Sequence, residues 1–181
     1  FNGACDIRQA DIIGAEFLGQ VKNLNGKFVF NRDSLIADNL RAQLLGVPFK
    51  IKLQIKDFSA PVLNINTDFD LSILPDIIKD KFSFSLINSA SGRAALALKM
   101  HPDNQGAWVV QGSLNITGAG LKLDKLDKLD SLIEDIDARV EFSQQGLNWA
   151  NTKFKYQGVN YQSSGELADF TTPKVKLKLN S

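Results

Sequence analysis

The most regular pattern in this sequence runs from Val47 to Leu71 and reads VPFKIKLQIKDFSAPVLNINTDFDL. Apolar and polar side chains alternate through both halves of this stretch, and a short polar segment separates the halves. Because successive side chains of a strand point to opposite sides, a period of two predicts a β-hairpin with one apolar and one polar face. A turn centred near Ser59 would pair residues whose numbers sum to about 118. Phe49 would then lie opposite Phe69, and Lys50 opposite Asp68.

The turn of this hairpin recurs later in the chain. DFSAP at Asp57–Pro61 matches DFTTP at Asp169–Pro173, and we call the shift that carries Asp57 onto Asp169 the repeat offset. The same offset places Phe30 on Phe142, Asn39 on Asn151 and Gly46 on Gly158. Self-similarity at a fixed period is typical of repeat architectures. We therefore expect two related β-blocks, residues 1–82 with a short closing helix and residues 83–181.

Bulk composition narrows the class of protein. The 181 residues are 44% hydrophobic and 23% charged, which indicates a folded domain. The 21 basic and 20 acidic residues leave a net charge of +1, without the basic excess that nucleic-acid binding requires. The single cysteine, Cys5, excludes an intrachain disulfide framework. No apolar run is long enough to predict a transmembrane helix. Because the alternation at Lys174–Lys178 is unfinished, we expect a segment of a longer or processed chain.

The rest of the chain favours strands with a few short interruptions. Helical or irregular crossings are predicted at Asp11–Leu18, at Ser72–Phe82 and, as an amphipathic helix, at about Leu121–Glu134, and a polar connector at Ser83–Gly92. The apolar positions of Leu35–Leu44 change phase, which predicts a bulge or a twist. The fold class that follows is mainly β, an antiparallel curled sheet or β-groove of about 12–13 strands with two or three short helical crossings.

The sequence offers little for catalysis. The only histidine, His101, lies in the turn HPDNQG, and no histidine accompanies Cys5. Glycine-rich phosphate loops, calcium loops and metal-spaced clusters of histidine, cysteine and acid are absent from the sequence. We therefore predict no enzyme activity, no cofactor and no metal site.

The apolar side of the predicted sheet must be covered by something. One alternative is a closed sandwich or barrel whose apolar faces pack together. The other is an apolar trough that acyl chains fill. Each buried methylene contributes roughly 0.8 kcal/mol, so a 16-carbon chain offers on the order of 10 kcal/mol before costs.

Several segments resemble the AsmA-like family, including its TamB and YhdP relatives. They are LNGKFVFNRDSLIADNLRAQLLGVPFKIKLQIKDFSAPVLNINTDFDLSILPD (Leu24–Asp76), SGRAALALKM and WVVQGSLNITGAGLKL. The second block departs from the pattern, because Ala138 stands where the first block has Gly26. The resemblance implies repeating β-groove units in periplasmic, inner-membrane-anchored proteins of Gram-negative-type bacteria. It also implies phospholipid movement towards the outer membrane, and it supplies no catalytic residues.

Together these features predict a lipid conduit. Its partners would be phospholipid or another acyl-chain lipid, neighbouring repeats of a longer chain, and a membrane contacted through parts outside this segment. The predicted lining comprises Phe28, Phe30, Phe49, Ile51, Leu53, Ile55, Leu63, Ile65, Phe69, Leu96, Leu98, Trp108, Val110, Leu114, Val140, Phe142, Tyr161, Leu167, Val175, Leu177 and Leu179. The alternative is a structural or adhesive β-sandwich module that acts through loops or edge strands. The polar-face lysines would then serve solubility and guard the edges of the sheet.

Overall fold

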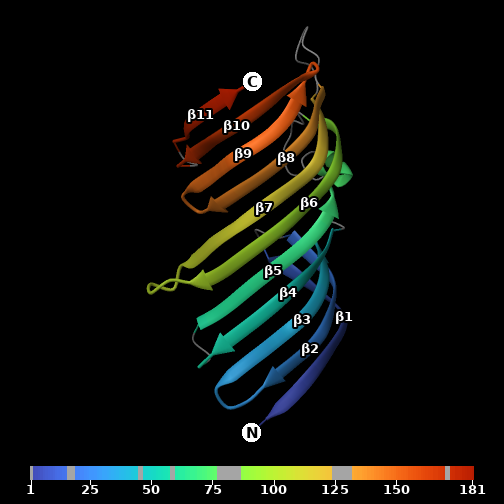
Figure 1. The fold of residues 1–181 in the computed structure, drawn as a ribbon. Helices are drawn as coiled ribbons and strands as arrows, with labels where there is room; N and C mark the ends of the chain where they lie inside the picture. Colours follow the sequence, from blue (N-terminus) through green and yellow to red (C-terminus); the bar gives the residue numbers. More distant parts are fainter. Residues whose placement is uncertain are drawn as a thin grey trace. The chain divides into compact units, whose positions relative to one another are not determined.

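The computed structural model describes residues 2–15, 19–44, 47–57, 60–76, 87–123, 132–169 and 172–181, nearly all of them in strands (Figure 1). The strands are β1 (Gly3–Ala15), β2 (Gly19–Phe30), β3 (Ser34–Leu44), β4 (Val47–Lys56), β5 (Ala60–Asp70), β6 (Ile87–Pro102), β7 (Trp108–Leu123), β8 (Leu132–Ser143), β9 (Gly146–Tyr156), β10 (Val159–Ala168) and β11 (Lys174–Asn180). A single turn of 3-10 helix, η1 (Leu71–Ile73), follows β5.

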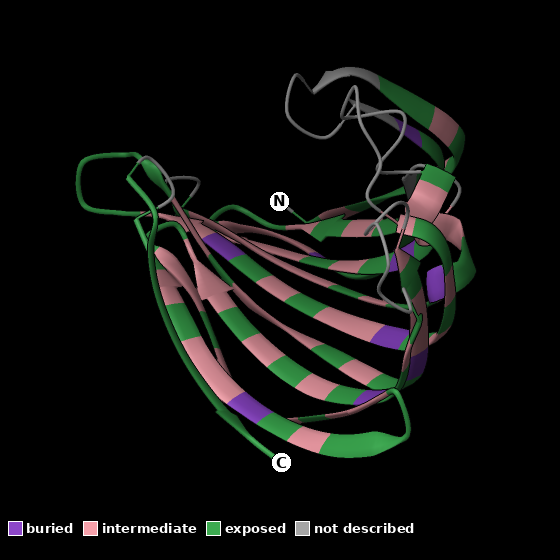
Figure 2. Cartoon of the chain, turned by 90° about the horizontal axis from the view of Figure 1, so that it is seen from above, coloured by how far each residue is buried: buried purple, intermediate pink, exposed green. Residues whose placement is uncertain are grey.

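The eleven strands form one sheet in which each strand is hydrogen-bonded to the next along the sequence. The strand pairs with a described register are all antiparallel. The order is linear and ends on β1 and β11, so the sheet is not closed. Many of the strands curve along their length (Figure 2). The predicted class, a mainly β, antiparallel and curled sheet, is confirmed, with eleven strands in the described residues instead of 12 or 13.

The chain divides into two compact units. The first comprises residues 1–68 and 96–112, and the second comprises residues 69–95 and 113–181. The unit boundaries therefore cut through β5, β6 and β7. The division predicted between residues 82 and 83 falls in segment 77–86, which lies outside the described residues.

A bulge in β3 gives the first unit its continuous apolar side. Ala37 pairs with Leu53, and Leu40 pairs with Ile51. Between these two pairs β3 contains one residue more than β4. The extra residue turns Leu40 to the same side as Ala37. This confirms the bulge predicted within Leu35–Leu44.

The register of the β4–β5 hairpin differs from the predicted one. Ile51 pairs with Ile65, and Lys50 pairs with Asn66 instead of Asp68. The hairpin is tighter than expected, because Lys56 already pairs with Ala60. Since the slip is two residues, every side chain keeps the face that the alternation predicts.

Strands β8–β10 of the second unit reproduce β2–β4 at the repeat offset. The bounds of β9 and β10 are those of β3 and β4 moved by that offset, and the pair Leu40–Ile51 becomes Thr152–Ser163. The loop hydrogen bond also recurs. The Asp57 amide donates to the Asp33 carbonyl at 2.7 Å, and the Asp169 amide donates to the Gln145 carbonyl at 2.9 Å.

The last hairpin breaks the correspondence. In the first unit Ile55 pairs with Pro61, and the repeat offset carries these residues onto Leu167 and Pro173. Leu167 instead pairs with Val175. The β10–β11 register is therefore two residues longer than that of β4–β5. It is the register that the sequence predicted for the first copy.

Three predicted interruptions are wrong where the structure describes them. Asp11–Ala15 continues β1 instead of beginning a crossing, because a register shift between Ile7 and Ala10, with Gln9 at a φ of 52°, breaks the alternation without ending the strand. Residues 87–92 of the predicted connector belong to β6. Residues 121–123 and 132–134 of the predicted amphipathic helix are strand, and residues 124–131 lie outside the described part of the chain.

The crossing predicted after β5 begins as a helical turn. Asp70 caps η1, since its Oδ1 accepts a hydrogen bond of 2.8 Å from the Ser72 amide. The residues predicted to continue it beyond Asp76 lie outside the described part of the chain.

Candidate functional site

The first unit carries an apolar face assembled from β1–β5, which we call the first apolar face. Its buried members are Val21, Leu24, Ala37, Leu40, Ala42 and Phe49. Partly buried side chains pack against them, namely Ile7, Ala10, Phe28, Ile51, Leu53 and Ile65. Two register shifts in β2, between Lys22 and Asn25 and between Asn25 and Val29, accompany the bulge in β3. They let neighbouring strands keep their apolar side chains on one side despite the broken alternation.

The second unit carries a comparable surface, the second apolar face. Its buried members are Leu71, Ala94, Ala119 and Ile136. The partly buried ones are Phe69, Leu74, Ala90, Leu114, Ile116, Leu121, Ile133, Ala138 and Phe154. Phe154 on β9 stacks on Tyr161 of β10, with ring centroids 5.4 Å apart and planes at 17°. Beside them the Trp149 Nε1–H donates to the Ser163 hydroxyl at 3.3 Å.

Most side chains of the predicted lining are only half-buried. All described strands belong to one sheet, so in the described part of the chain no second sheet covers the apolar faces. Along β4, Ile51, Leu53 and Ile55 remain partly accessible, and only Phe49 of the predicted lining is buried. Apolar side chains between two packed layers are normally buried, so these faces can take up further apolar material.

The structure brings seven of the 21 predicted lining residues into the two apolar faces. These are Phe28, Phe49, Ile51, Leu53 and Ile65 in the first face and Phe69 and Leu114 in the second. The others lie outside both clusters, and four of them are exposed. The exposed four are Trp108 (43%), Val175 (61%), Leu177 (63%) and Leu179 (52%).

Sequence reasoning missed the buried residues that lie next to irregularities in the strands. Val21 and Leu24 are three residues apart and flank Asn23, which has a φ of 54°. Ala37 and Leu40 flank the β3 bulge, which contains Asp38 and Asn39. An Asn or Asp at which the apolar phase changes is the signal that could have revealed them, because these residues tolerate positive φ better than most.

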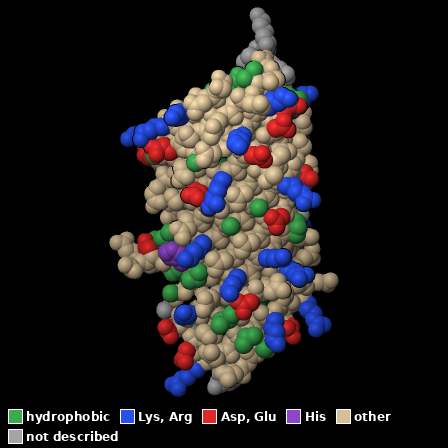
Figure 3. Space-filling model, in the orientation of Figure 1, with side chains coloured by type: hydrophobic (Ala, Val, Ile, Leu, Met, Phe, Trp, Pro, Cys, Tyr) green, Lys and Arg blue, Asp and Glu red, His purple; other side chains and the backbone are tan. Residues whose placement is uncertain are grey.

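The side chains on the molecular face shown in Figure 3 are mostly polar, with both signs of charge intermingled. Lys52 and Asp38 form an exposed ion pair at 3.0 Å, as do Arg139 and Glu141 at 3.1 Å. Such mixed charge confers solubility and little affinity for a ligand of one sign.

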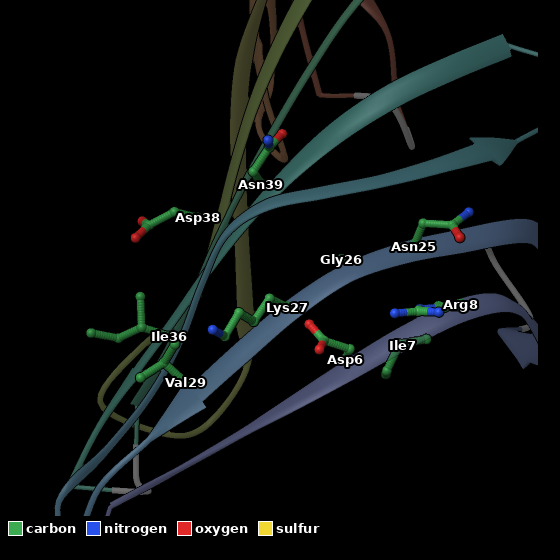
Figure 4. A pocket seen from close by; sticks show the side chains of 10 residues that line it. All are labelled: Asp6, Ile7, Arg8, Asn25, Gly26, Lys27, Val29, Ile36, Asp38 and Asn39. Carbon is green, nitrogen blue, oxygen red and sulfur yellow. The ribbon is translucent and has the colours of Figure 1, made fainter.

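The described residues line several hollows that contain charged side chains. One of about 830 Å³ lies among β1–β3 of the first unit (Figure 4). It is lined by Asp6, Ile7, Arg8, Asn25, Gly26, Lys27, Val29, Ile36, Asp38 and Asn39. Two smaller hollows of about 500 and 310 Å³ lie in the second unit. An acyl chain in any of the three would remove water from charged side chains without offering them a partner, which is unfavourable.

The side chains considered for chemistry lie apart from one another. His101 is half-buried, and its Nδ1 lies 3.0 Å from the Pro102 carbonyl oxygen. Cys5 is exposed on the edge strand β1. Among the described residues, no group of three or more histidines, cysteines and acids is placed to hold a metal ion. The described helical residues include no helix that could cross a bilayer.

Comparison with protein-family models, with curated proteins and with solved structures found no match. The resemblance to the AsmA-like family rests on sequence patterns, chiefly that of Leu24–Asp76.

Proposed function

We propose that the two apolar faces bind the acyl chains of phospholipid or a similar lipid. The observation that supports this most is the incomplete burial of side chains such as Ile51, Leu53 and Ile65 in a sheet without a described second layer. Leaving these groups in water is unfavourable, and a lipid tail would remove that contact. Each methylene of the tail that leaves water contributes roughly 0.8 kcal/mol.

The composition of the two faces favours an alkyl chain over a polar ligand. Aliphatic side chains predominate in both clusters. These side chains cannot orient a headgroup by hydrogen bonding, so binding would depend mainly on the tail. We expect weak selectivity for the headgroup and affinity that rises with tail length.

The wider role rests on the correspondence of β2–β4 with β8–β10. Two blocks with the same strand pairing at one offset, and with two strands of identical bounds, fit repeats of a single β-groove unit. We propose that the chain is a segment of an AsmA-like repeating β-groove protein, periplasmic and anchored in the inner membrane through parts outside this segment. Neighbouring repeats would extend the surface along which lipid moves towards the outer membrane.

Lipid binding can be tested with one pair of adjacent residues. The variant Ile51→Glu places a charge on the first apolar face, whereas Lys50→Glu changes the charge on the opposite side of the same strand. Titration with pyrene-labelled phosphatidylcholine should show affinity lower by about tenfold for Ile51→Glu, because the tail would desolvate the carboxylate. Lys50→Glu should bind as the unmodified chain does.

Native mass spectrometry of the purified chain provides the complementary readout. We expect lipid to co-purify and to be depleted in Ile51→Glu, with circular dichroism establishing that each variant is folded. Failure of the unmodified chain to bind phosphatidylcholine, or equal binding by both variants, would refute the proposal.

A second candidate function is a structural or adhesive module that acts through an edge strand. The exposure of the apolar residues Val175, Leu177 and Leu179 on β11 favours it. Such a module would bind protein partners and leave labelled phosphatidylcholine in solution.

A further inference from the structure

Two hydroxyl groups lie on the apolar side of the second unit. Thr152 of β9 pairs with Ser163 of β10, and we call these two residues the hydroxyl pair. Phe154, two residues further along β9, belongs to the second apolar face, so alternation places Thr152 on the same side of the sheet. At the repeat offset the hydroxyl pair corresponds to Leu40 and Ile51, which both belong to the first apolar face. The second unit therefore carries two hydroxyl groups where the first carries two aliphatic side chains.

The hydroxyl pair has unused hydrogen-bonding capacity within the described part of the chain. Thr152 Oγ1 is buried and has no hydrogen-bond partner there. Ser163 is only 8% exposed, and its hydroxyl oxygen accepts a hydrogen bond from Trp149. Among the described residues the Ser163 hydroxyl donates to no acceptor. Because buried polar groups are normally paired, two unused donors on neighbouring strands indicate a place where the acceptor of a ligand can bind.

Aromatic side chains flank the hydroxyl pair on both sides along the strands. On one side Trp149 lies over Gly165, where an added Cβ atom would fall 2.5 Å from the indole Cζ2. On the other side Phe154 stacks on Tyr161. In the register of β9 and β10, the hydroxyl pair lies between the pairs Trp149–Gly165 and Phe154–Tyr161. These rings limit the access of water, which strengthens a hydrogen bond formed between them.

We propose that the hydroxyl pair binds the ester carbonyl of a lipid whose acyl tail lies on the second apolar face. This inference rests on the proposed function and adds the chemical group that the second unit recognises. The three strand pairs that form the site contain no charged side chain, so a carboxylate or a phosphate would lack a counter-charge there. An ester carbonyl is neutral, accepts two hydrogen bonds and is attached directly to the tail. Rotation of Thr152 between staggered χ1 positions turns its hydroxyl towards the ligand.

Two phosphatidylcholines that differ only in their linkages test this inference. Dipalmitoyl phosphatidylcholine has ester carbonyls, whereas its dihexadecyl ether analogue has the same headgroup and chain length without them. The change Trp108→Phe leaves Trp149 as the only tryptophan, so its fluorescence reports binding beside the hydroxyl pair. The ester lipid should bind about five- to tenfold more tightly than the ether lipid, because only its carbonyl accepts the additional hydrogen bonds.

Variants in the Trp108→Phe chain assign the preference to the hydroxyl pair. Thr152→Val and Ser163→Ala together should abolish the preference for the ester lipid and leave the affinity for the ether lipid unchanged. The control Ser164→Ala removes a hydroxyl from the opposite side of β10 and should retain the preference. Circular dichroism establishes that each variant is folded. Without lipid, Thr152→Val should not lower the urea midpoint of unfolding, because its hydroxyl has no described partner to lose.

The outcomes separate this inference from the proposed function. Equal affinities for the ester and ether lipids, or a preference that survives the double change, would overturn the inference and leave acyl-chain binding in place. If neither lipid alters the Trp149 emission, the inference also fails, and the pyrene titration of Ile51→Glu decides the proposed function at the first apolar face. A preference that the double change removes and Ser164→Ala retains supports the inference.

Discussion

Gly26 of β2 lies directly against Leu40 of β3. A Cβ atom added at Gly26 would fall 2.6 Å from the Leu40 Cδ2 and 3.0 Å from its Cα, and Gly26 has a φ of 152°. At the repeat offset the pair becomes Ala138 and Thr152. In the second block the residue equivalent to glycine is larger, and the residue equivalent to leucine is smaller. The presence of Ala138 in place of glycine is therefore accompanied by a smaller residue at the position that glycine contacts in the first block.

Gly26→Ala should destabilise the chain by about 1–3 kcal/mol, since the new methyl collides with Leu40 and the backbone conformation disfavours alanine. Urea unfolding gives the value. The control is Gly158→Ala, at a φ of 80° with no other atom within 4 Å of the added Cβ, which adds backbone strain without a collision. Gly26→Ala should cost less in a Leu40→Ala background. If Gly26→Ala lowered the free energy of unfolding equally in both backgrounds, the Leu40 side chain would not be the group that the added methyl meets.

Leucines on the apolar face and on the edge should differ sharply. Leu40 is 3% exposed and Leu177 is 63% exposed. Leu40→Ala should lower the free energy of unfolding by about 2–4 kcal/mol and Leu177→Ala by less than about 0.5 kcal/mol. Thermal unfolding followed by circular dichroism measures both. A large effect of Leu177→Ala would mean that β11 is already covered in solution.

Equivalent irregular positions of the two blocks should respond alike. Asn23 and Asp135 are related by the repeat offset and have φ values of 54° and 51°. A β-branched residue is strained at such angles, so valine should be less stable than glycine by about 1–3 kcal/mol at each site. Comparing valine with glycine cancels the loss of side-chain hydrogen bonds. A difference at only one of the two sites would contradict the structural equivalence of the blocks.

The ion pair on β11 should be visible in the titration of Lys176. Its hydrogen bond to Glu166, with the attraction between the two charges, raises the pKa of Lys176 above its ordinary value. The pair therefore stabilises the fold at pH values below the ordinary lysine pKa and stops doing so as the pH rises through the raised one. NMR titration of the lysine side chains should show this shift, and Glu166→Gln should abolish it. High salt should reduce it, because both groups are exposed.

Asp70 should titrate below the ordinary aspartate range. The hydrogen bonds from the Ser72 backbone and side chain lower the pKa of Asp70, with a further contribution from the charge of Arg93. This stabilisation is present above the ordinary pKa and is lost as the pH falls through the lowered one. The amide proton of Ser72 should report the titration by NMR. In Asp70→Asn this pH dependence should disappear, and its persistence would assign the titration to another group.

Some features of this protein follow from local sequence alone. Alternation across residues such as Ile51 to Ile55 indicates a strand whatever the strand contacts, because side-chain direction along an extended backbone is a local property. The same reasoning identified the phase change before Leu40 as a bulge or a twist. It failed at Asp11–Ala15, where a positive φ at Gln9 interrupts the alternation inside a continuous strand.

The alternation of apolar and polar residues could not predict strand register or the burial of individual side chains. A slip of two residues in the β4–β5 hairpin leaves every side chain on its face, so alternation cannot distinguish Ile51 opposite Ile65 from a neighbouring register. Alternation also could not separate buried Phe49 from exposed Leu177, since both lie on the apolar side of a strand. Burial depends on which strands lie on either side and on what covers the face.

The β class, the two-faced strands and the offset that relates the two blocks follow from the order of residues along the chain. The pairing of the strands into one unclosed sheet, and the bulges that gather Val21, Leu24 and Leu40 into one face, depend on the tertiary fold. Those outcomes depend on contacts between residues far apart in the sequence, and a local period carries no information about them.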